Sequence, residues 1–330
     1  MVAHIYIHPD NFRYNKVDSE AYLASKLKSL VNDMEEVVYE HNDENKFFVV
    51  PGLFEIDVFY KEQLIPFVNK SLTGDEQGVL YTMLADVAEG TDTMTLEELE
   101  SRCHYRPEEE NPTSMVVLNA SEEDDEVEEE KGESKDYIQF DHYEIIYGKD
   151  NWRTFRRQIL GNYPGSAANF IAECDTYFPE LQIHRNCISS LCDENYDYLK
   201  TSSRRIVYYL SVLNDCFKGV YEKYIKNGEL TYTPNAILAD FSGIYRLDIP
   251  GSLDAEPSTR TARTFEFKSK WTDAQVRLYC DPHLKIELPD KEYCGTYRKL
   301  DFHPRIYFHY KYEIETMTMQ IYVGSIGKHL

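Results

Sequence analysis

The last quarter of the chain is built from short segments in which apolar and polar residues alternate, and this pattern constrains the fold more than any other feature. Turn-forming residues separate five such segments: Arg263–Lys268, Val276–Cys280, Leu284–Leu288, Arg305–Tyr310 and Met319–Gly324. Alternation with a period of two is typical of half-buried strands, and several short strands joined by turns indicate an antiparallel arrangement. The sequence therefore predicts a small antiparallel sheet domain over residues 241–330.

Before residue 241 the apolar residues follow the helical period instead. Between Ser203 and Lys226 they recur at spacings of three and four, and Asn227-Gly228 ends the pattern. Such spacing places the apolar residues on one face of a helix. A similar helix is expected from about Ser19, with its apolar face formed by Leu23, Leu27, Leu30, Met34 and Val37. We therefore predict an α+β protein with a mostly helical region over residues 1–240, which holds a few strands at 4–8, 46–50 and 137–147.

The acidity of the chain is confined to this first region. The formal net charge is −23 for the whole chain, −24 before residue 241 and +1 from there onward. Part of it lies in the low-complexity segment Ser121–Asp136, which is expected to be a disordered insertion because like charges repel and apolar anchors are missing. This distribution excludes a protein coated in positive charge to hold nucleic acid. The N-terminal region is expected to bind a protein partner, whereas the C-terminal domain remains able to meet RNA.

The sequence indicates a reducing, intracellular environment. We expect no signal peptide in Met1–Pro9 and no segment of about 20 apolar residues that would cross a bilayer, so no membrane partner is expected. The seven cysteines are an odd number and widely scattered, which favours reduced thiols and a cytoplasmic location. The spacing of His184, Cys187 and Cys192 lacks the second pair of a zinc site. No metal or cofactor is expected under the leading interpretation.

The chemistry-bearing residues gather on the predicted C-terminal strands. Successive strands or strand ends contribute cationic and imidazole groups, namely His283, Lys285, Arg305, Lys328 and His329. If these strands are neighbours, the groups converge, and such a set suits cleavage of RNA without metal. A base would take the proton of the 2′-hydroxyl while cations stabilise the developing negative charge. Nearby aromatic residues that would stack on bases are Tyr279, Tyr307 and Tyr310.

Three short motifs in this region resemble a known family. His283-Leu-Lys285, Arg305-Ile-Tyr-Phe308 and the final Ile326-Gly-Lys-His329 are similar to the corresponding segments of RelE/HigB-type toxins, over about residues 270–330. Pro304 stands where a tyrosine commonly precedes the arginine in that family. The resemblance implies a ribosome-dependent endoribonuclease. The leading prediction is thus a toxin-like effector that acts on RNA in bacterial antiviral defence against phage.

Other interpretations of the same residues stay open. Asp254 with Glu266 and Lys268 resembles the PD-(D/E)xK nuclease pattern, in which carboxylates hold Mg²⁺ and the lysine orients the attacking water. In a third interpretation, the chain is a non-enzymatic subunit of a larger defence assembly, and the basic strand residues are structural. Two short basic segments, Arg153–Arg157 and Ser202–Arg205, would receive phosphates or pair with the surrounding acidic residues.

Overall fold

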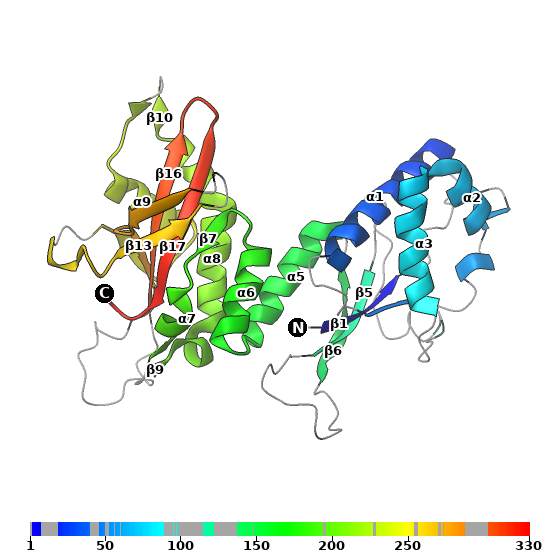
Figure 1. Cartoon of the computed structure of the whole chain (residues 1–330), viewed down its shortest axis with the longest axis horizontal. Helices are drawn as coiled ribbons and strands as arrows, with labels where there is room; N and C mark the ends of the chain where they lie inside the picture. Colours follow the sequence, from blue (N-terminus) through cyan, green and yellow to red (C-terminus); the bar gives the residue numbers. More distant parts are fainter. Residues whose placement is uncertain are drawn as a thin grey trace. The chain divides into compact units, whose positions relative to one another are not determined.

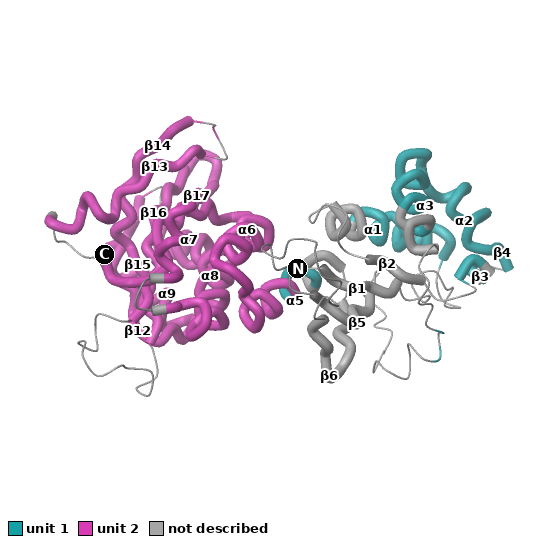
Figure 2. The backbone as a smooth tube through the Cα atoms, turned by 60° about the horizontal axis from the view of Figure 1, so that its bottom comes forward, with its two compact units in different colours: residues 1–155 teal, residues 156–330 magenta. Residues whose placement is uncertain are grey.

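The computed structural model of the chain consists of two compact units, Met1–Phe155 and Arg156–Leu330 (Figure 2). It describes residues 2–7, 19–39, 46–49, 53–55, 57–59, 61–88, 95, 97, 115–121, 137–146, 148–193, 196–226, 229–253, 257–269, 272, 274–287 and 303–330. The α+β class is confirmed, because both units combine helices with sheets (Figure 1). Of the predicted acidic insertion, only Ser121 lies within the described residues.

The first unit holds a four-stranded sheet and a group of helices. The strands are β1 (Val2–Ile7), β2 (Lys46–Val49), β5 (Met115–Ser121) and β6 (Tyr137–Ile146), in the order β2-β1-β5-β6. The strands predicted at 4–8, 46–50 and 137–147 are therefore present. The helices are α1 (Glu20–Tyr39), α2 (Leu64–Ser71) and α3 (Gly74–Ala88), beside a short turn of helix at Leu53–Glu55 and a small hairpin of β3 (Asp57–Phe59) and β4 (Glu62–Gln63).

Helix α1 forms because its apolar residues repeat at helical spacing, as predicted. Leu23, Leu27 and Leu30 are buried against residues of α2 and α3, which include Phe67 and Leu80. The backbone N–H of Tyr22 donates to the side chain of Ser19, so this serine caps the first turn. Burial of a leucine of this kind stabilises the fold by about 1.5–3 kcal/mol.

The second unit is organised around a five-stranded mixed sheet. Its strands are β12 (Ile249–Ser252), β15 (His283–Lys285), β16 (Arg305–Glu313), β17 (Thr318–Gly327) and β7 (Leu181–Ile183), in that spatial order. All neighbours are antiparallel except β7, which pairs with β17 in parallel through Ile321–Val323. The four strands from residue 241 onward are antiparallel as predicted, and β7 makes the sheet mixed because it joins from a segment far earlier in the chain.

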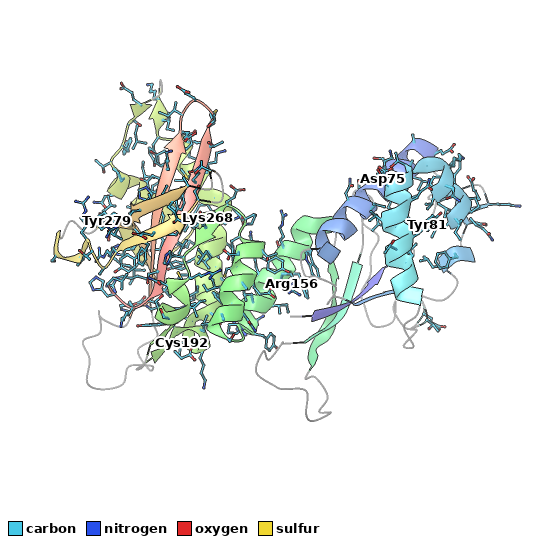
Figure 3. All side chains as sticks on the ribbon, viewed as in Figure 1. Asp75, Tyr81, Arg156, Cys192, Lys268 and Tyr279 are labelled. Carbon is cyan, nitrogen blue, oxygen red and sulfur yellow. The ribbon has the colours of Figure 1, made fainter. Side chains whose placement is uncertain are left out.

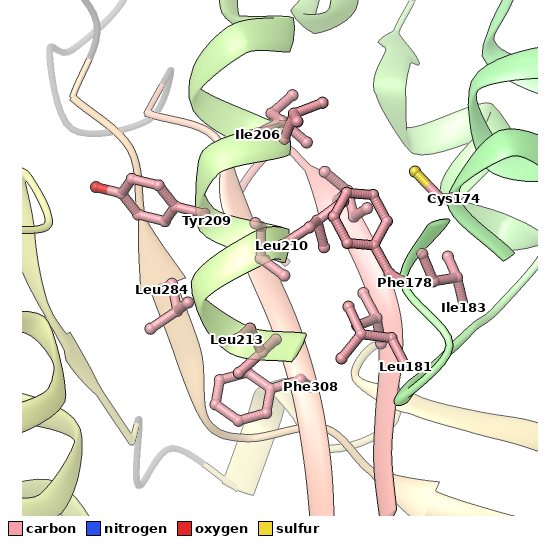
Figure 4. Close-up of a cluster of buried hydrophobic side chains, with 14 of the residues drawn as sticks. Cys174, Phe178, Leu181, Ile183, Ile206, Tyr209, Leu210, Leu213, Leu284 and Phe308 are labelled. Carbon is pink, nitrogen blue, oxygen red and sulfur yellow. The ribbon is translucent and has the colours of Figure 1, made fainter. Parts of the chain in front are cut away.

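Helices cover one face of this sheet. They are the end of α5 (Gly148–Asn162), α6 (Ala167–Tyr177), α7 (Asn186–Leu191), α8 (Tyr198–Glu222) and α9 (Pro234–Ile244). Ile206, Leu210 and Leu213 of α8 point at the sheet, where they form one buried cluster with Leu284 and Phe308 (Figure 4). Helix α8 is the helix predicted over 203–226. It begins five residues earlier because Asp197 caps it by accepting the backbone N–H of Lys200 at 3.0 Å.

The boundary expected near residue 240 lies inside this second unit. Helices α8 and α9 precede that position, yet their apolar residues share one core with the C-terminal strands. A sheet with one apolar face has to bury it against another layer, and here the helices supply that layer. The strands from residue 241 onward are therefore one layer of a larger unit that begins at Arg156.

A two-stranded hairpin covers part of the opposite face of the sheet. Its strands, β13 (Thr264–Lys268) and β14 (Gln275–Tyr279), pair only with each other. Phe265 and Phe267 of β13 are buried against Tyr307 and Tyr322 of the sheet. Gly324 makes this close approach possible, because a Cβ at this position would overlap the ring of Phe265. Two further short hairpins connect the helices: β8 (Cys192–Asp193) with β9 (Tyr196–Asp197), and β10 (Ile225–Lys226) with β11 (Glu229–Leu230).

Gly327→Ala is expected to lower the free energy of unfolding by about 3 kcal/mol or more. Gly327 has a φ of 145°, and a Cβ there would overlap the backbone carbonyl of Ser190. The matched control is Gly219→Ala, since a Cβ at Gly219 in α8 would meet nothing within 4 Å. The control should stabilise the protein by about 0.5–1 kcal/mol. Urea unfolding of both variants tests this expectation, which fails if the two shift stability in the same direction.

Candidate functional site

The strand register places the predicted basic residues at one end of the mixed sheet. Lys285 at the end of β15 lies opposite Arg305 at the start of β16, and Arg305 lies opposite Gly327 at the end of β17. Lys328 and His329 follow directly and are exposed. These four residues therefore come together in space, although up to 44 positions separate them in the sequence. We refer to Lys285, Arg305, Lys328 and His329 as the basic end of the sheet.

Alternation along the strands decides which face each residue occupies. Leu284, Ile306 and Ile326 point into the core that the sheet shares with α8. Their neighbours His283, Lys285, Arg305 and Tyr307 consequently lie on the opposite face, together with the β13–β14 hairpin. His283 and Tyr307 are fully buried, Arg305 is 8% exposed and Lys285 is half-buried. The side chains that reach solvent are thus Lys285, Lys328 and His329.

Arg263 is a member of this site that the sequence does not reveal. It lies just before β13, is fully buried, and its guanidinium stands 4.8 Å from the centre of the Tyr307 ring. Its Nη2 donates to the carbonyl oxygen of Leu330 at 2.8 Å, and its Nη1 lies 3.5 Å from Oδ1 of Asp281. Because Leu330 is 67 positions further along the chain, no local pattern marks this arginine.

His329 is held at the surface by this buried arginine. Its Nε2 lies 3.5 Å from Nη2 of Arg263. A guanidinium has donors only, so Nε2 is the acceptor and carries the lone pair. The next residue is also fixed, because the backbone N–H of Leu330 donates to the Tyr307 hydroxyl at 3.2 Å. While Nε2 accepts from Arg263 its lone pair is engaged, so the imidazole can take a proton there only when this 3.5 Å contact opens.

His283 has a different position from the one predicted for a catalytic group. Its ring lies 5.1 Å from the Tyr307 ring, and its Nδ1 is 3.1 Å from the carbonyl oxygen of Asp281, which fixes Nδ1 as the protonated nitrogen. Its Nε2 is 3.4 Å from the hydroxyl of Ser252. His283 is fully buried, and both of its ring nitrogens contact protein atoms.

The three tyrosines predicted to stack on bases do not form one surface. Tyr310 packs against Phe217 and Tyr221 of α8, on the face opposite Tyr307, because residues an odd number of positions apart on a strand point to opposite faces. Burial raises the pKa of Tyr310 to about 12. Tyr307 is fully buried, and Tyr279 donates its hydroxyl to Asp281 at 3.0 Å. Tyr279 is half-buried, and the guanidinium of Arg260 stands over its ring at 5.5 Å.

The alternative metal site is only partly within the described residues. Glu266 and Lys268 are both exposed on the outer face of β13, as alternation predicts, whereas Asp254 lies outside the described residues. Lys268 and Tyr279 lie at opposite ends of the hairpin (Figure 3). In the part of the chain that the structure describes, no three His, Cys, Asp or Glu side chains are grouped to hold a metal ion. The described residues likewise include no helix long and apolar enough to cross a membrane.

The histidine and cysteines with partial zinc spacing have other surroundings. His184 packs against the rings of Phe265 and Phe267, at 5.3 and 5.1 Å between centroids. Cys187 is buried in the core that the helices share with the sheet, and this burial raises the pKa of its thiol well above the ordinary value. Cys192 is exposed at the start of the β8–β9 hairpin, where its thiol lies 3.8 Å from Asp197.

A pH dependence of stability follows from His309. Burial lowers the pKa of His309 below its ordinary value of 6.5, while its Nδ1 donates to the carbonyl oxygen of Tyr279. The unfolded state therefore binds more protons once the pH falls below about 6.5, and the folded state is destabilised there. The stabilising contribution of neutral His309 should therefore be fully present well above this pH. The free energy of unfolding should decline as the pH falls from 7 to 5. In His309→Gln the decline, measured by urea unfolding across this range, should be shallower, and an unchanged slope would refute this cause.

Comparison of the chain with models of known protein families, with curated proteins and with solved structures finds no match. The function therefore has to be inferred from the residues themselves.

Proposed function

We propose that the chain is a toxin-like effector that cleaves RNA at the basic end of its C-terminal sheet, without a metal ion. The observation that carries the proposal is the strand register, which aligns Lys285, Arg305 and the residues after Gly327 at one sheet end. A phosphodiester that bears negative charge is the ligand that such a group of cations and an imidazole suits best.

Each residue would have one role in this cleavage of RNA. His329 takes the proton of the 2′-hydroxyl at Nε2 once its contact with Arg263 opens, the 2′-oxygen attacks the phosphorus, and the bond from phosphorus to the 5′-oxygen breaks. The products are a 2′,3′-cyclic phosphate and a 5′-oxygen that is protonated from Lys328 or from solvent. Lys285 and Lys328 contact the phosphate, because their side chains reach solvent. Arg263 and Arg305 are buried beneath them and add positive charge at short range.

The resemblance of residues 270–330 to RelE/HigB-type toxins supports RNA as the substrate and the ribosome as the partner. It also supports a role in bacterial defence against phage, as the leading prediction from the sequence has it. The acidic N-terminal region would then bind a protein partner. A cytoplasmic location follows from a ribosomal target.

Expression in bacteria tests this proposal in the cell. The wild-type chain should arrest growth, and the double variant Lys328→Ala/His329→Ala should not, because it removes two exposed groups of the basic end. Lys311→Ala is the control, since Lys311 is exposed on the same sheet and pairs with Glu313 at 3.1 Å. Equal arrest by the wild type and the double variant would refute the proposal, as would the absence of arrest from a well-expressed wild-type chain. The latter result would favour a non-enzymatic subunit.

A further inference from the structure

A basic cavity lies between the end of α5 and the first turns of α8. Its volume is about 390 Å³, and it is lined by Gly161 and Asn162 of α5 and by residues 200–205 of α8. Those α8 residues are Lys200-Thr-Ser-Ser-Arg-Arg205, and no Asp or Glu is among the lining residues. Lys200 and Arg204 are four positions apart and therefore lie on the same face of the helix. The composition of the lining is that of a site for an anion.

Two of the cationic side chains, those of Lys200 and Arg204, have no carboxylate or carbonyl partner among the described residues. Lys200 and Arg204 are exposed, and neither side chain has a hydrogen bond or an ion pair with any residue that the structure describes. Arg205 differs, because its Nη1 contacts the carbonyl oxygen of Glu287 and lies 3.5 Å from Oδ2 of Asp248. For the basic segment Ser202–Arg205, pairing with a nearby acidic residue is therefore observed for Arg205 but not for Arg204 among the described residues.

Two arginines of the basic segment Arg153–Arg157 differ from Lys200 and Arg204, because they are paired with carboxylates. Nη2 of Arg156 lies 3.0 Å from Oε1 of Glu173, and Nη1 of Arg157 lies 2.6 Å from Oδ2 of Asp215. Both arginines therefore fix α5 to neighbouring helices. The unit has carboxylates available for its structural arginines and places none in the cavity of α8.

The walls of the cavity are held by specific contacts. Ser203 is buried, and its hydroxyl donates to the carbonyl oxygen of Gly161 at 2.7 Å. A Cβ at Gly161 would stand 3.3 Å from Cα of Arg204, tighter than most such contacts, so glycine allows α5 to end against α8. The distance between the two walls is consequently set by the fold and does not depend on a ligand.

Helix α8, which forms one wall of the cavity, also contacts β15 and the residues that follow it. The Arg205 contact at Glu287 is two residues beyond Lys285, and the Tyr209 hydroxyl of α8 donates to the carbonyl oxygen of Lys285 at 3.0 Å.

We propose that this cavity is a phosphate-binding site, in which Lys200 and Arg204 contact the phosphate oxygens. The phosphate belongs either to the backbone of single-stranded RNA or to a small phosphorylated ligand. This site is separate from the proposed cleavage residues, and it stands whether or not the chain cleaves RNA.

Binding by the full chain tests the proposal with two probes, a fluorescently labelled single-stranded RNA and inorganic pyrophosphate. The variant is Lys200→Gln/Arg204→Gln, and the control is Lys223→Gln/Lys226→Gln, which removes two exposed cations beyond the other end of α8. The variant should weaken binding about tenfold or more, the loss expected for one charge-assisted contact. If RNA is the ligand, the slope of log affinity against log salt should fall by about 0.7, the value for one phosphate on a single strand.

The outcomes distinguish an RNA phosphate from a small phosphorylated ligand, and they also show whether the cavity binds phosphate at all. Weakened binding of RNA by the variant alone supports a backbone phosphate, and weakened binding of pyrophosphate alone supports a small ligand. The proposal is overturned if the wild type binds neither probe, or if the variant and the control bind as the wild type does. Inorganic pyrophosphate has no 2′-hydroxyl and is not cleaved, so its binding reports on the cavity even if the chain does not cleave RNA.

Discussion

His329→Ala is expected to slow RNA cleavage by about 10²- to 10⁴-fold, the usual contribution of a general base. His329 is exposed and carries its lone pair on Nε2, beside Arg263 at 3.5 Å. Its loss should leave the free energy of unfolding within about 0.5 kcal/mol of the wild type, because an exposed side chain contributes little to packing. The measurement is the initial rate of cleavage on free RNA and on ribosome-bound messenger.

Two comparisons make this result specific to the imidazole. Lys311→Ala should cleave at the wild-type rate, since Lys311 lies on β16 away from the basic end. Added imidazole should restore part of the rate to His329→Ala, because a small base from solution then replaces the missing side chain. An undiminished rate in His329→Ala would show that this histidine is not the base.

Arg263→Ala is expected to lower the free energy of unfolding by about 3–5 kcal/mol, as when one partner of a buried charge pair is removed. The side chain is fully buried and joins three parts of the site: the Tyr307 ring, Asp281 and the carbonyl oxygen of Leu330. Its loss leaves a cavity under the hairpin and removes the contact that holds His329. Urea unfolding should show the destabilisation directly.

Arg260→Ala is the matched control for this prediction. Arg260 also stands over a tyrosine, at 5.5 Å from the centre of the Tyr279 ring, but it is exposed. A cation over an aromatic ring at an exposed site contributes about 0.5–1 kcal/mol. If the two variants lose the same stability, the buried network around Arg263 does not hold this end of the sheet together.

The elements that follow a strong period are predictable from the sequence. The apolar repeat of α8 and the alternation in β13, β14, β16 and β17 are local signals, and all of these elements are present. Strand β7 is only Leu181–Ile183, too short for its alternation to be recognised, and its pairing with β17 is a tertiary event. The division of the chain also depends on tertiary packing, since α8 and α9 share their core with later strands.

The candidate site, too, can be predicted from the sequence only in part. That His283, Lys285 and Arg305 share one face follows from alternation once β15 and β16 are known to be neighbours. Parity alone places Tyr307 and Tyr310 on opposite faces, so this part of the prediction was correctable from the sequence. The burial of His283 and Tyr307 could not be predicted from the sequence. The hairpin that covers them packs there through Phe265 and Phe267, and only the fold brings these rings to the sheet.

The central claim, metal-free cleavage of RNA at the basic end of the sheet, is tested most directly by the chemical ends of the fragments. Purified chain is incubated with free RNA and with ribosome-bound messenger, and the new ends are identified. Attack by the 2′-oxygen predicts 2′,3′-cyclic phosphates and 5′-hydroxyls, lost in Lys328→Ala/His329→Ala. Fragments with 5′-phosphates and 3′-hydroxyls, or intact RNA in both settings, would contradict the claim.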